Sequence, residues 1–373
     1  MWLDRYSAQS IDEEDIAAVA AALRSGSLTG GAAVEAFEDA LCEFTGANAA
    51  IAVSNATAGL HAAYLAAGVG AGDEIITTPI TFAATANAAI YCGAKPIFAD
   101  IDYESGNIDP NAIAPLITKR TKAIVPVHYG GSLCDMEAIC DIAARHKIVV
   151  IEDAAHALGS FDRHKQSAGR SGAIGIFSFH PVKPITTGEG GAVITDDPVL
   201  AKRLRRLRSH GIAKGELWFQ DMQTLGFNYR LSDIAAALGR SQLTKLHASI
   251  AKREAIATYY DRFFAKNDKI VSLKLPQQNS HSRHLYPVLL DCALHAKKEQ
   301  IFTALRAEGV GVQVHYKPVY RHSYYEQQFG AQNLKFAELF YAAELSLPCH
   351  QLMSLQEAEK TAETLTKLVK QNS

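Results

Sequence analysis

Short apolar runs alternate with longer segments of helical periodicity from residue 49 onward. Nearly continuous apolar runs are typical of strands buried on both faces of a parallel sheet. The segments between them are long enough for the helical crossovers that parallel strands require. The pattern therefore predicts an α/β fold around a mostly parallel, seven-stranded sheet. The predicted strands are 50–53, 74–78, 96–99, 123–127, 148–151, 174–179 and 192–195, and the predicted helices between them are 57–67, 83–92, 111–116 and 136–146.

The last two predicted strands break this rhythm. About a dozen residues separate Phe179 from Ala192, too few for a helical crossover, so this pair is expected to run antiparallel. The connection between them then emerges as a loop at one end of the sheet. That loop contains Lys183.

Longer helical segments follow Asp196, beginning with predicted helices at 231–246 and near 258–264. We expect a domain boundary near Ser241, which divides the chain into a large domain, 1–240, and a smaller α+β domain, 241–373. In the smaller domain the pattern predicts strands at 285–290 and 312–315 and helices at 299–308, 334–343 and 356–369.

The composition favours a protein that acts on small molecules. Thirty-seven basic and 39 acidic residues leave a formal charge of −2, which gives no general attraction to nucleic acid or to a membrane surface. The six cysteines form no Cys-x-x-Cys pair, and no apolar run approaches the roughly 18 residues of a membrane span. The first eleven residues carry Asp4 and Arg5 and lack the apolar stretch of a secretory signal, so we expect a cytoplasmic protein.

Lys183 is the first candidate for chemistry. The segment Ser178-Phe-His-Pro-Val-Lys-Pro-Ile-Thr-Thr-Gly-Glu-Gly-Gly191 follows a predicted buried strand. A lysine in such a loop is usually just solvated. Here prolines and aliphatic residues flank it, and a lysine that forms a Schiff base must be partly desolvated so that its amine loses its proton. The segment therefore favours a reactive amine.

A pair of carboxylates, Glu152 and Asp153, follows another apolar run directly and continues as Ala154-Ala155-His156. A pyridine cofactor needs one ionised carboxylate against its ring nitrogen, because a protonated ring withdraws electrons from the substrate. Capping of the following turn is the alternative for Asp153. Both possibilities stay open on this segment alone.

Ser54-Asn55-Ala56-Thr57 lies between the first predicted strand and a helix. The N-terminus of a helix offers free N–H groups and a positive dipole end, so this turn can hold a phosphate; an ordinary helix cap is the alternative. The glycine-rich segment 68–73 follows a helix and precedes a strand, which is the reverse of a dinucleotide loop, and is interpreted as a turn.

Two further clusters are weaker candidates for chemistry. His128, His156, His164 and His180 lie in the same half of the chain but form no pair at metal-binding spacing, so no metal site is expected. The basic run 202–208 carries Leu204 and Leu207 at helical spacing, which predicts a solvated amphipathic helix ahead of a phosphate-binding patch.

These motifs resemble those of the DegT/DnrJ/EryC1/StrS family of sugar aminotransferases, and the resemblance covers nearly the whole chain. It rests on Ser-x-His-x-x-Lys with Gly-Glu-Gly-Gly at 178–191, on Glu-Asp-Ala-Ala-His at 152–156, and on Gly-x-Asn-x-Arg at 226–230. The resemblance implies the aspartate aminotransferase type fold (fold type I), pyridoxal 5'-phosphate (PLP) as cofactor with pyridoxamine phosphate as intermediate, and a homodimer.

The family also implies roles for particular residues. Lys183 would bind the cofactor and shuttle the proton, and Asp153 would pair with the ring nitrogen. Phe82 would stack on the ring, with His156 near the phenolic oxygen. The phosphate would be held by Ala56, Thr57, Ser178 and, from the partner subunit, Asn228.

Three stretches, 54–61, 77–82 and 313–316, are most similar to the family members that serve pseudaminic acid biosynthesis. The implied substrates are L-glutamate as amino donor and a UDP-4-keto-6-deoxy-N-acetylhexosamine as acceptor; a bacillosamine-type acceptor is the alternative. Pro184 departs from the polar residue expected there and puts the acceptor in doubt. The residues expected to line the sugar site are Tyr6, Gly26, Ser27, Leu28, Thr29, Arg230, Gln313, Val314, His315 and Tyr316.

Three other functions remain as alternatives: a pyridoxamine-dependent sugar dehydratase, a non-catalytic accessory protein on the same fold, and an NAD-dependent dehydratase. In the family's dehydratases a histidine replaces the lysine, and a non-catalytic chain would have no chemical reason to keep both Lys183 and Asp153. The NAD-dependent enzyme requires a glycine loop between a strand and a helix, which this sequence lacks.

Overall fold

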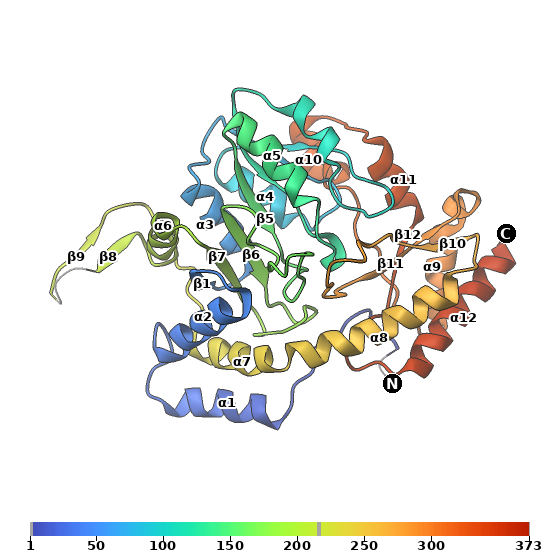
Figure 1. Ribbon diagram of the computed structural model, residues 1–373, viewed down its shortest axis with the longest axis horizontal. Helices are drawn as coiled ribbons and strands as arrows, with labels where there is room; N and C mark the ends of the chain where they lie inside the picture. The colour runs from blue at the N-terminus through green and yellow to red at the C-terminus, as the bar shows by residue number, and fades with distance from the viewer. Residues whose placement is uncertain (1–2, 215–217, 373) are drawn as a thin grey trace.

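The computed structural model describes residues 3–214 and 218–372 and is built around a seven-stranded sheet of order β1-β7-β6-β5-β4-β2-β3 (Figure 1). All seven predicted strands are present. β7 runs antiparallel to β6, as the short connection predicted, and also antiparallel to β1, which was not predicted. The other pairs are parallel. The strands are β1 (Ala49–Val53), β2 (Glu74–Thr77), β3 (Lys95–Phe98), β4 (Thr121–Val125), β5 (Val149–Asp153), β6 (Ile174–Ser178) and β7 (Gly191–Thr195).

Helices cover both faces of this sheet, because successive side chains of a strand point to opposite faces. In β1, Ile51 and Val53 pack toward α3 (Ala56–Ala66), α4 (Ala84–Tyr91) and α6 (Pro198–Arg208). Ala50 and Ala52 face the other side, which α2 (Ala32–Thr45), α5 (Met136–His146) and α7 (Asp233–Thr244) cover. The basic run lies in α6 with Leu204 buried and Lys202 exposed, which confirms the predicted amphipathic helix.

The helix predicted at 111–116 was wrong, and the helices before residue 49 were not predicted. Residues 110–116 form two short 3-10 turns, Pro110–Ala112 and Ala114–Leu116, and no α-helix. Pro115 lies inside the predicted helix and lacks the N–H that would donate to the carbonyl of Asn111 in an α-helix. The N-terminal helices α1 (Glu13–Arg24) and α2 were not predicted, although Asp12 and Asp15 form a capping box at the start of α1.

The C-terminal part has its own apolar core. One face of the sheet formed by β10 (Ile270–Ser272), β11 (Tyr286–Leu290) and β12 (Glu344–Leu347) packs against three helices (Figure 1). They are α8 (Leu246–Phe264), α9 (Lys298–Ala307) and α12 (Leu355–Asn372). The opposite face meets α11 (Lys335–Ala343), and α10 (Ser323–Phe329) precedes that helix.

The predicted strand at 312–315 was wrong: Gln313 forms only an isolated bridge with Ser346 of β12. The predicted domain boundary near Ser241 falls inside α7, and Lys245 alone separates α7 from α8. The division into domains 1–240 and 241–373 stays a prediction. These ranges include residues 1, 2, 215–217 and 373, which lie outside the part that the structure describes.

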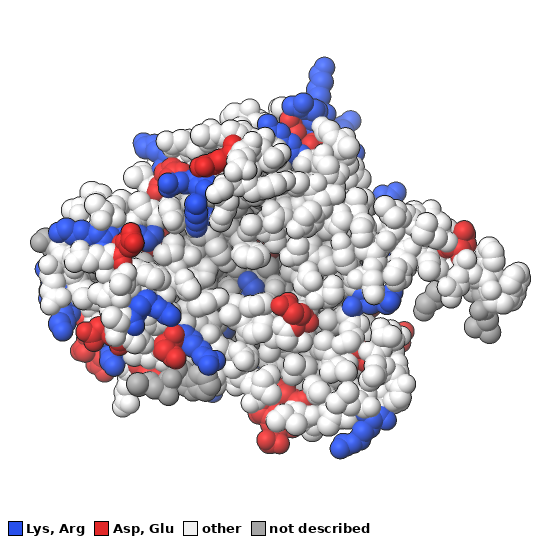
Figure 2. All heavy atoms as spheres, turned by 180° about the vertical axis from the view of Figure 1, so that it is seen from behind, with Lys and Arg blue, Asp and Glu red and all other residues white. Residues whose placement is uncertain are grey.

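A two-stranded hairpin, β8 (Ile212–Lys214) and β9 (Gln220–Met222), projects from the body of the molecule (Figure 1). Trp218 is 81% exposed on this arm, and Met222 and Leu225 are also exposed. On the face seen in Figure 2, acidic and basic side chains are interspersed over the body, whereas uncharged side chains cover most of the arm. Within the described residues, no helix is both long and apolar enough to cross a bilayer.

Candidate active site

A cavity of about 930 Å³ opens at the end of the large sheet where the parallel strands finish. Open α/β sheets bind ligands at this edge. The cavity brings together most of the residues singled out in the sequence, from both halves of the chain. They are Tyr6, Ala56, Thr57, Phe82, Asp153, His156, Ser178, Lys183, Gln313, Val314, His315 and Tyr316.

Lys183 lies in the loop between β6 and β7, where its N–H donates to the carbonyl of His180. Its Nζ is 3.4 Å from Nε2 of His284, a buried residue that the sequence analysis did not single out. Burial of the amine lowers the pKa of Lys183 to about 8, although Asp153 nearby opposes this shift. Pro184 is buried in the same loop and so adds to its apolar side.

Asp153 ends β5 with its side chain turned into the cavity. Its Oδ2 accepts a hydrogen bond of 2.7 Å from Oγ1 of Thr85, and its Oδ1 accepts from the N–H of Ala155 at 3.1 Å. Burial raises the pKa of Asp153, while these two hydrogen bonds and Lys183 favour the ionised carboxylate. Asp153 therefore does bind the N–H of the following turn, and the same residue also lines the cavity.

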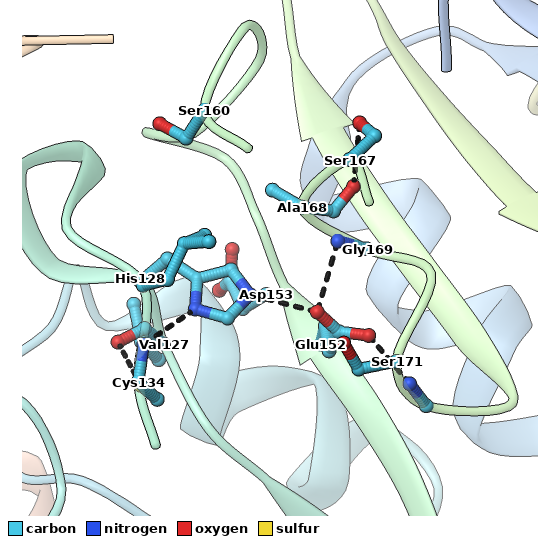
Figure 3. A network of polar contacts seen from close by, with 12 residues as sticks. Val127, His128, Cys134, Glu152, Asp153, Ser160, Ser167, Ala168, Gly169 and Ser171 are labelled. Atoms are coloured by element: carbon cyan, nitrogen blue, oxygen red, sulfur yellow. Dashed lines mark hydrogen bonds and ion pairs between the residues drawn. The ribbon is translucent and has the colours of Figure 1, made fainter. Parts of the chain in front are cut away.

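Glu152 precedes Asp153 in the strand and points to the opposite side (Figure 3). It accepts hydrogen bonds from Nε2 of His128 at 2.8 Å and from the N–H groups of Gly169 and Gly172 at 2.9 and 2.6 Å. Nδ1 of His128 in turn accepts from the N–H of Cys134. This network holds the end of β5 from behind, so only one carboxylate of the pair is available to a ligand in the cavity.

The N-terminus of α3 forms another wall of the cavity. The side chain of Asn55 caps the N–H of Ala58 at 2.8 Å, and no described residue accepts from the N–H groups of Ala56 and Thr57. A Cβ on Gly191 of β7 would lie 2.7 Å from the nitrogen of Ala56, so glycine lets the helix end approach the sheet. The arrangement leaves free N–H donors for an anion such as a phosphate.

Aromatic side chains form a further part of the cavity wall. The ring of Phe82 is 64% exposed and lies 6.5 Å from the ring of Tyr316. The Tyr316 hydroxyl is 3.1 Å from Nε2 of His156, whose Nδ1 accepts from the N–H of Gly130. Burial holds the pKa of His156 and of His284 well below the ordinary value, so both rings are neutral around the Lys183 amine.

These groups fit pyridoxal phosphate. The cavity provides a lysine whose amine loses its proton more easily than usual, a buried carboxylate and a helix N-terminus with free N–H donors. A flat aromatic ring lies beside them. The lysine suits the aldehyde of the cofactor and the carboxylate suits its ring nitrogen. The helix N-terminus suits the phosphate, and the aromatic side chain suits the face of the pyridine ring.

The remaining predicted site residues do not line this cavity. Asn228 and Arg230 form isolated bridges with Ser209 and Val53, and Thr29 forms one with Ser232. The cavity is lined within one chain without them or the preceding segment Gly26, Ser27 and Leu28. Their predicted contribution to the site stays a prediction.

Known proteins match this chain over nearly its whole length. The profile of the DegT/DnrJ/EryC1/StrS aminotransferase family matches residues 9–366. The UDP-4-amino-4,6-dideoxy-N-acetyl-β-L-altrosamine transaminase of Campylobacter jejuni is 47% identical over 363 residues, which are 96% of each chain.

Two solved structures have the same fold. PseC of Helicobacter pylori, described as an aminotransferase involved in the biosynthesis of pseudoaminic acid, has a TM-score of 0.94 at 40% identity and covers 98% of this chain and 99% of its own. Spr1654 of Streptococcus pneumoniae, described as a sugar aminotransferase and solved in a PLP form, has a TM-score of 0.93 at 29% identity, with 98% of both chains covered.

Proposed function

The chain belongs to the DegT/DnrJ/EryC1/StrS aminotransferase family, and we propose that it transfers the amino group of L-glutamate to C4 of a UDP-4-keto-6-deoxy-N-acetylhexosamine. It is a PLP-dependent nucleotide-sugar aminotransferase. The proposed product is UDP-4-amino-4,6-dideoxy-N-acetyl-β-L-altrosamine, an intermediate of pseudaminic acid biosynthesis. The observation that carries the proposal is the identity of 47% with a transaminase of that name over 96% of both chains.

The cavity residues divide the work of such a reaction. When bound, PLP supplies an electron-withdrawing ring that carries the amino group between donor and acceptor. Lys183 would hold the cofactor and move the proton, since its lowered pKa lets it act as base and acid near neutral pH. Asp153 would keep the ring nitrogen protonated, and Phe82 would lie against the ring.

Other residues of the cavity would bind the cofactor phosphate and the sugar. The free N–H groups of Ala56 and Thr57, with the hydroxyl of Ser178, would hold the cofactor phosphate. His156 would lie near the phenolic oxygen. Tyr6 and the segment Gln313, Val314, His315 and Tyr316 would line the sugar site, a mostly apolar surface with a few polar groups.

We further propose a homodimer in which each active site receives residues from the partner subunit. Asn228, Arg230 and the segment Gly26, Ser27, Leu28 and Thr29 lie outside the cavity of their own chain. The hairpin arm also exposes apolar side chains that a second copy would cover. In such a dimer Asn228 would reach the cofactor phosphate of the partner.

The acceptor is tested by assaying the purified protein with L-glutamate and each of two UDP-4-keto-6-deoxy-N-acetylhexosamine epimers. We expect a clear preference for the L-arabino epimer in kcat/KM. A preference for the D-xylo epimer would contradict the pseudaminic assignment and indicate a bacillosamine-type reaction by the same chemistry. No turnover of either epimer would reject this acceptor class.

A further inference from the structure

A buried polar cluster lies behind the sugar-site wall and ends on the ring of His315. It consists of Glu344 and Ser346 of β12 and of His315 itself. Glu344 is 1% exposed, Ser346 is fully buried, and none of the three was part of the cofactor-binding groups above. The two strand residues are two positions apart, so their side chains project from the same face of β12.

The backbone of His315 is fixed from both sides. Its N–H donates to Oε2 of Glu344 at 2.8 Å, and its carbonyl accepts from the hydroxyl of Tyr129. Next to it, Gln313 and Ser346 exchange two backbone hydrogen bonds of 3.1 and 2.8 Å. The ring packs 5.0 Å from the ring of Tyr6. The position of the imidazole is therefore set by its surroundings.

The hydrogen bonds also set which ring nitrogen carries the proton. Nδ1 of His315 is 2.8 Å from Oγ of Ser346, and that hydroxyl donates to Oε1 of Glu344 at 2.5 Å. A serine hydroxyl has one proton. Once it is donated to the carboxylate, the oxygen can only accept from Nδ1–H. A neutral imidazole then has no proton on Nε2.

The charges support this assignment. Burial lowers the pKa of His315 to about 3, so the ring carries a single proton. Burial raises the pKa of Glu344 to about 7, with Lys298 and the two hydrogen bonds favouring its ionised form. No described residue bonds Nε2 of His315, which belongs to a side chain in the cavity wall.

We propose that Glu344 and Ser346 are positioning residues that keep the proton of His315 on Nδ1, so that Nε2 accepts a hydrogen bond from a hydroxyl or amide N–H of the sugar acceptor. A hydrogen-bond acceptor at this place would favour a neutral sugar group that can donate a hydrogen bond over an anionic group such as a carboxylate. The proposal rests on the proposed function, because it needs a sugar in this cavity.

The test compares Ser346→Ala and Glu344→Gln with Ser346→Thr in the PLP-loaded enzyme at pH 8. Ser346→Ala removes the bridge. Glu344→Gln reverses the direction of the hydrogen bonds. The glutamine oxygen would still accept from the N–H of His315, so its amide nitrogen would donate to Ser346. The hydroxyl of Ser346 would then donate to Nδ1, which places the ring proton on Nε2. Ser346→Thr keeps the hydroxyl and is the matched control.

We expect KM for the UDP-4-keto sugar to rise by up to about tenfold in both variants. Ser346→Ala no longer fixes the ring proton on Nδ1, and Glu344→Gln moves it to Nε2, where an amide N–H of the sugar can no longer donate. The rate of the half-reaction with L-glutamate, followed by the change in cofactor absorbance, should stay unchanged, and Ser346→Thr should resemble the wild type. The double variant should be no worse than the poorer single variant, because both changes act through one ring.

An unchanged sugar KM in a folded, PLP-loaded Ser346→Ala enzyme would overturn the proposal. So would an equal loss in the glutamate half-reaction, which would indicate a general structural defect. Ser346→Ala alone decides the matter if Glu344→Gln does not fold. Failure of the wild-type enzyme to turn over the sugar would instead reject the proposed function.

Discussion

At the scale of single residues, the two adjacent carboxylates of β5 do different work. Glu152 is bound by His128 and by two backbone N–H groups behind the strand, so it holds the strand end in place. Asp153 points into the cavity with a carboxylate oxygen held by Thr85. The hydroxyl of Thr85 is one of the groups that favour the ionised form of Asp153, whereas burial raises the pKa of Asp153.

Thr85→Val should lower kcat about tenfold, since it removes a hydrogen bond to an ionised group while keeping the size of the side chain. Steady-state kinetics at saturating substrates measures this, with circular dichroism as a check of folding. Thr85→Ser keeps the hydroxyl and should retain most of the activity. A wild-type kcat in Thr85→Val would show that Asp153 does not need this hydrogen bond.

The lowered pKa of Lys183 predicts a pH dependence for cofactor loading. A lysine whose pKa is about 8 is neutral above that pH, and only the neutral amine attacks an aldehyde. The rate of covalent PLP attachment to cofactor-free enzyme should therefore rise with pH and level off above about 8. Stopped-flow absorbance measures this rate. A rise that continues toward the ordinary lysine pKa of about 10.4 would contradict the account.

At the scale of elements, the phosphate site depends on how closely α3 approaches β7. Gly191→Ala would place a methyl group 2.7 Å from the nitrogen of Ala56 and 2.9 Å from the carbonyl oxygen of Phe177. We expect it to cost about 1–3 kcal/mol in the free energy of unfolding and to weaken PLP binding, because the helix end must move. Thermal unfolding with and without PLP measures both effects.

Gly70→Ala is the control for that substitution. Gly70 has no atom within 4 Å of its added Cβ and is not in the left-handed backbone region. Its stability and PLP affinity should stay close to those of the wild type. Equal effects of Gly70→Ala and Gly191→Ala would mean that close approach at β7 does not shape the phosphate site.

The pattern of the chain predicted the large sheet well because its strands are buried on both faces and read as apolar runs. It failed where polar residues interrupt a short strand: β12 carries Glu344 and Ser346, whose partners lie on the segment around His315. It also assigned helix to residues 111–116, where the prolines favour short turns.

The site was predictable to the extent that its residues follow strands directly. Lys183 and Asp153 come next to apolar runs, and their sequence motifs are distinctive. Thr85 and His284 are single polar residues on other elements, and only the folded chain brings them to Asp153 and Lys183. No local pattern could have identified them.

At the scale of the whole molecule, the proposed dimer predicts that two inactive chains can complement each other. Lys183→Ala lacks the amine, and Asn228→Ala lacks the phosphate contact that we assign to the partner's site. A mixed dimer would contain one intact site, so mixing the two proteins should restore part of the activity.

Each variant assayed alone is the control for that mixture, and subunit exchange is verified by native mass spectrometry. No recovery of activity despite exchange would show that Asn228 acts within its own chain or has no role. Recovery would also explain why Asn228, a predicted cofactor contact, lies outside the cavity of its own chain.

The most direct test of the central claim is to find which lysine binds the cofactor. The PLP-loaded protein is reduced with borohydride, digested and analysed by mass spectrometry. Lys317 also lines the cavity, so Lys317→Ala is the matched control. We predict that the wild type and Lys317→Ala carry the reduced cofactor on Lys183 and that Lys183→Ala carries none. Modification of another lysine in the wild type, or a reduced adduct that persists in Lys183→Ala, would contradict the account.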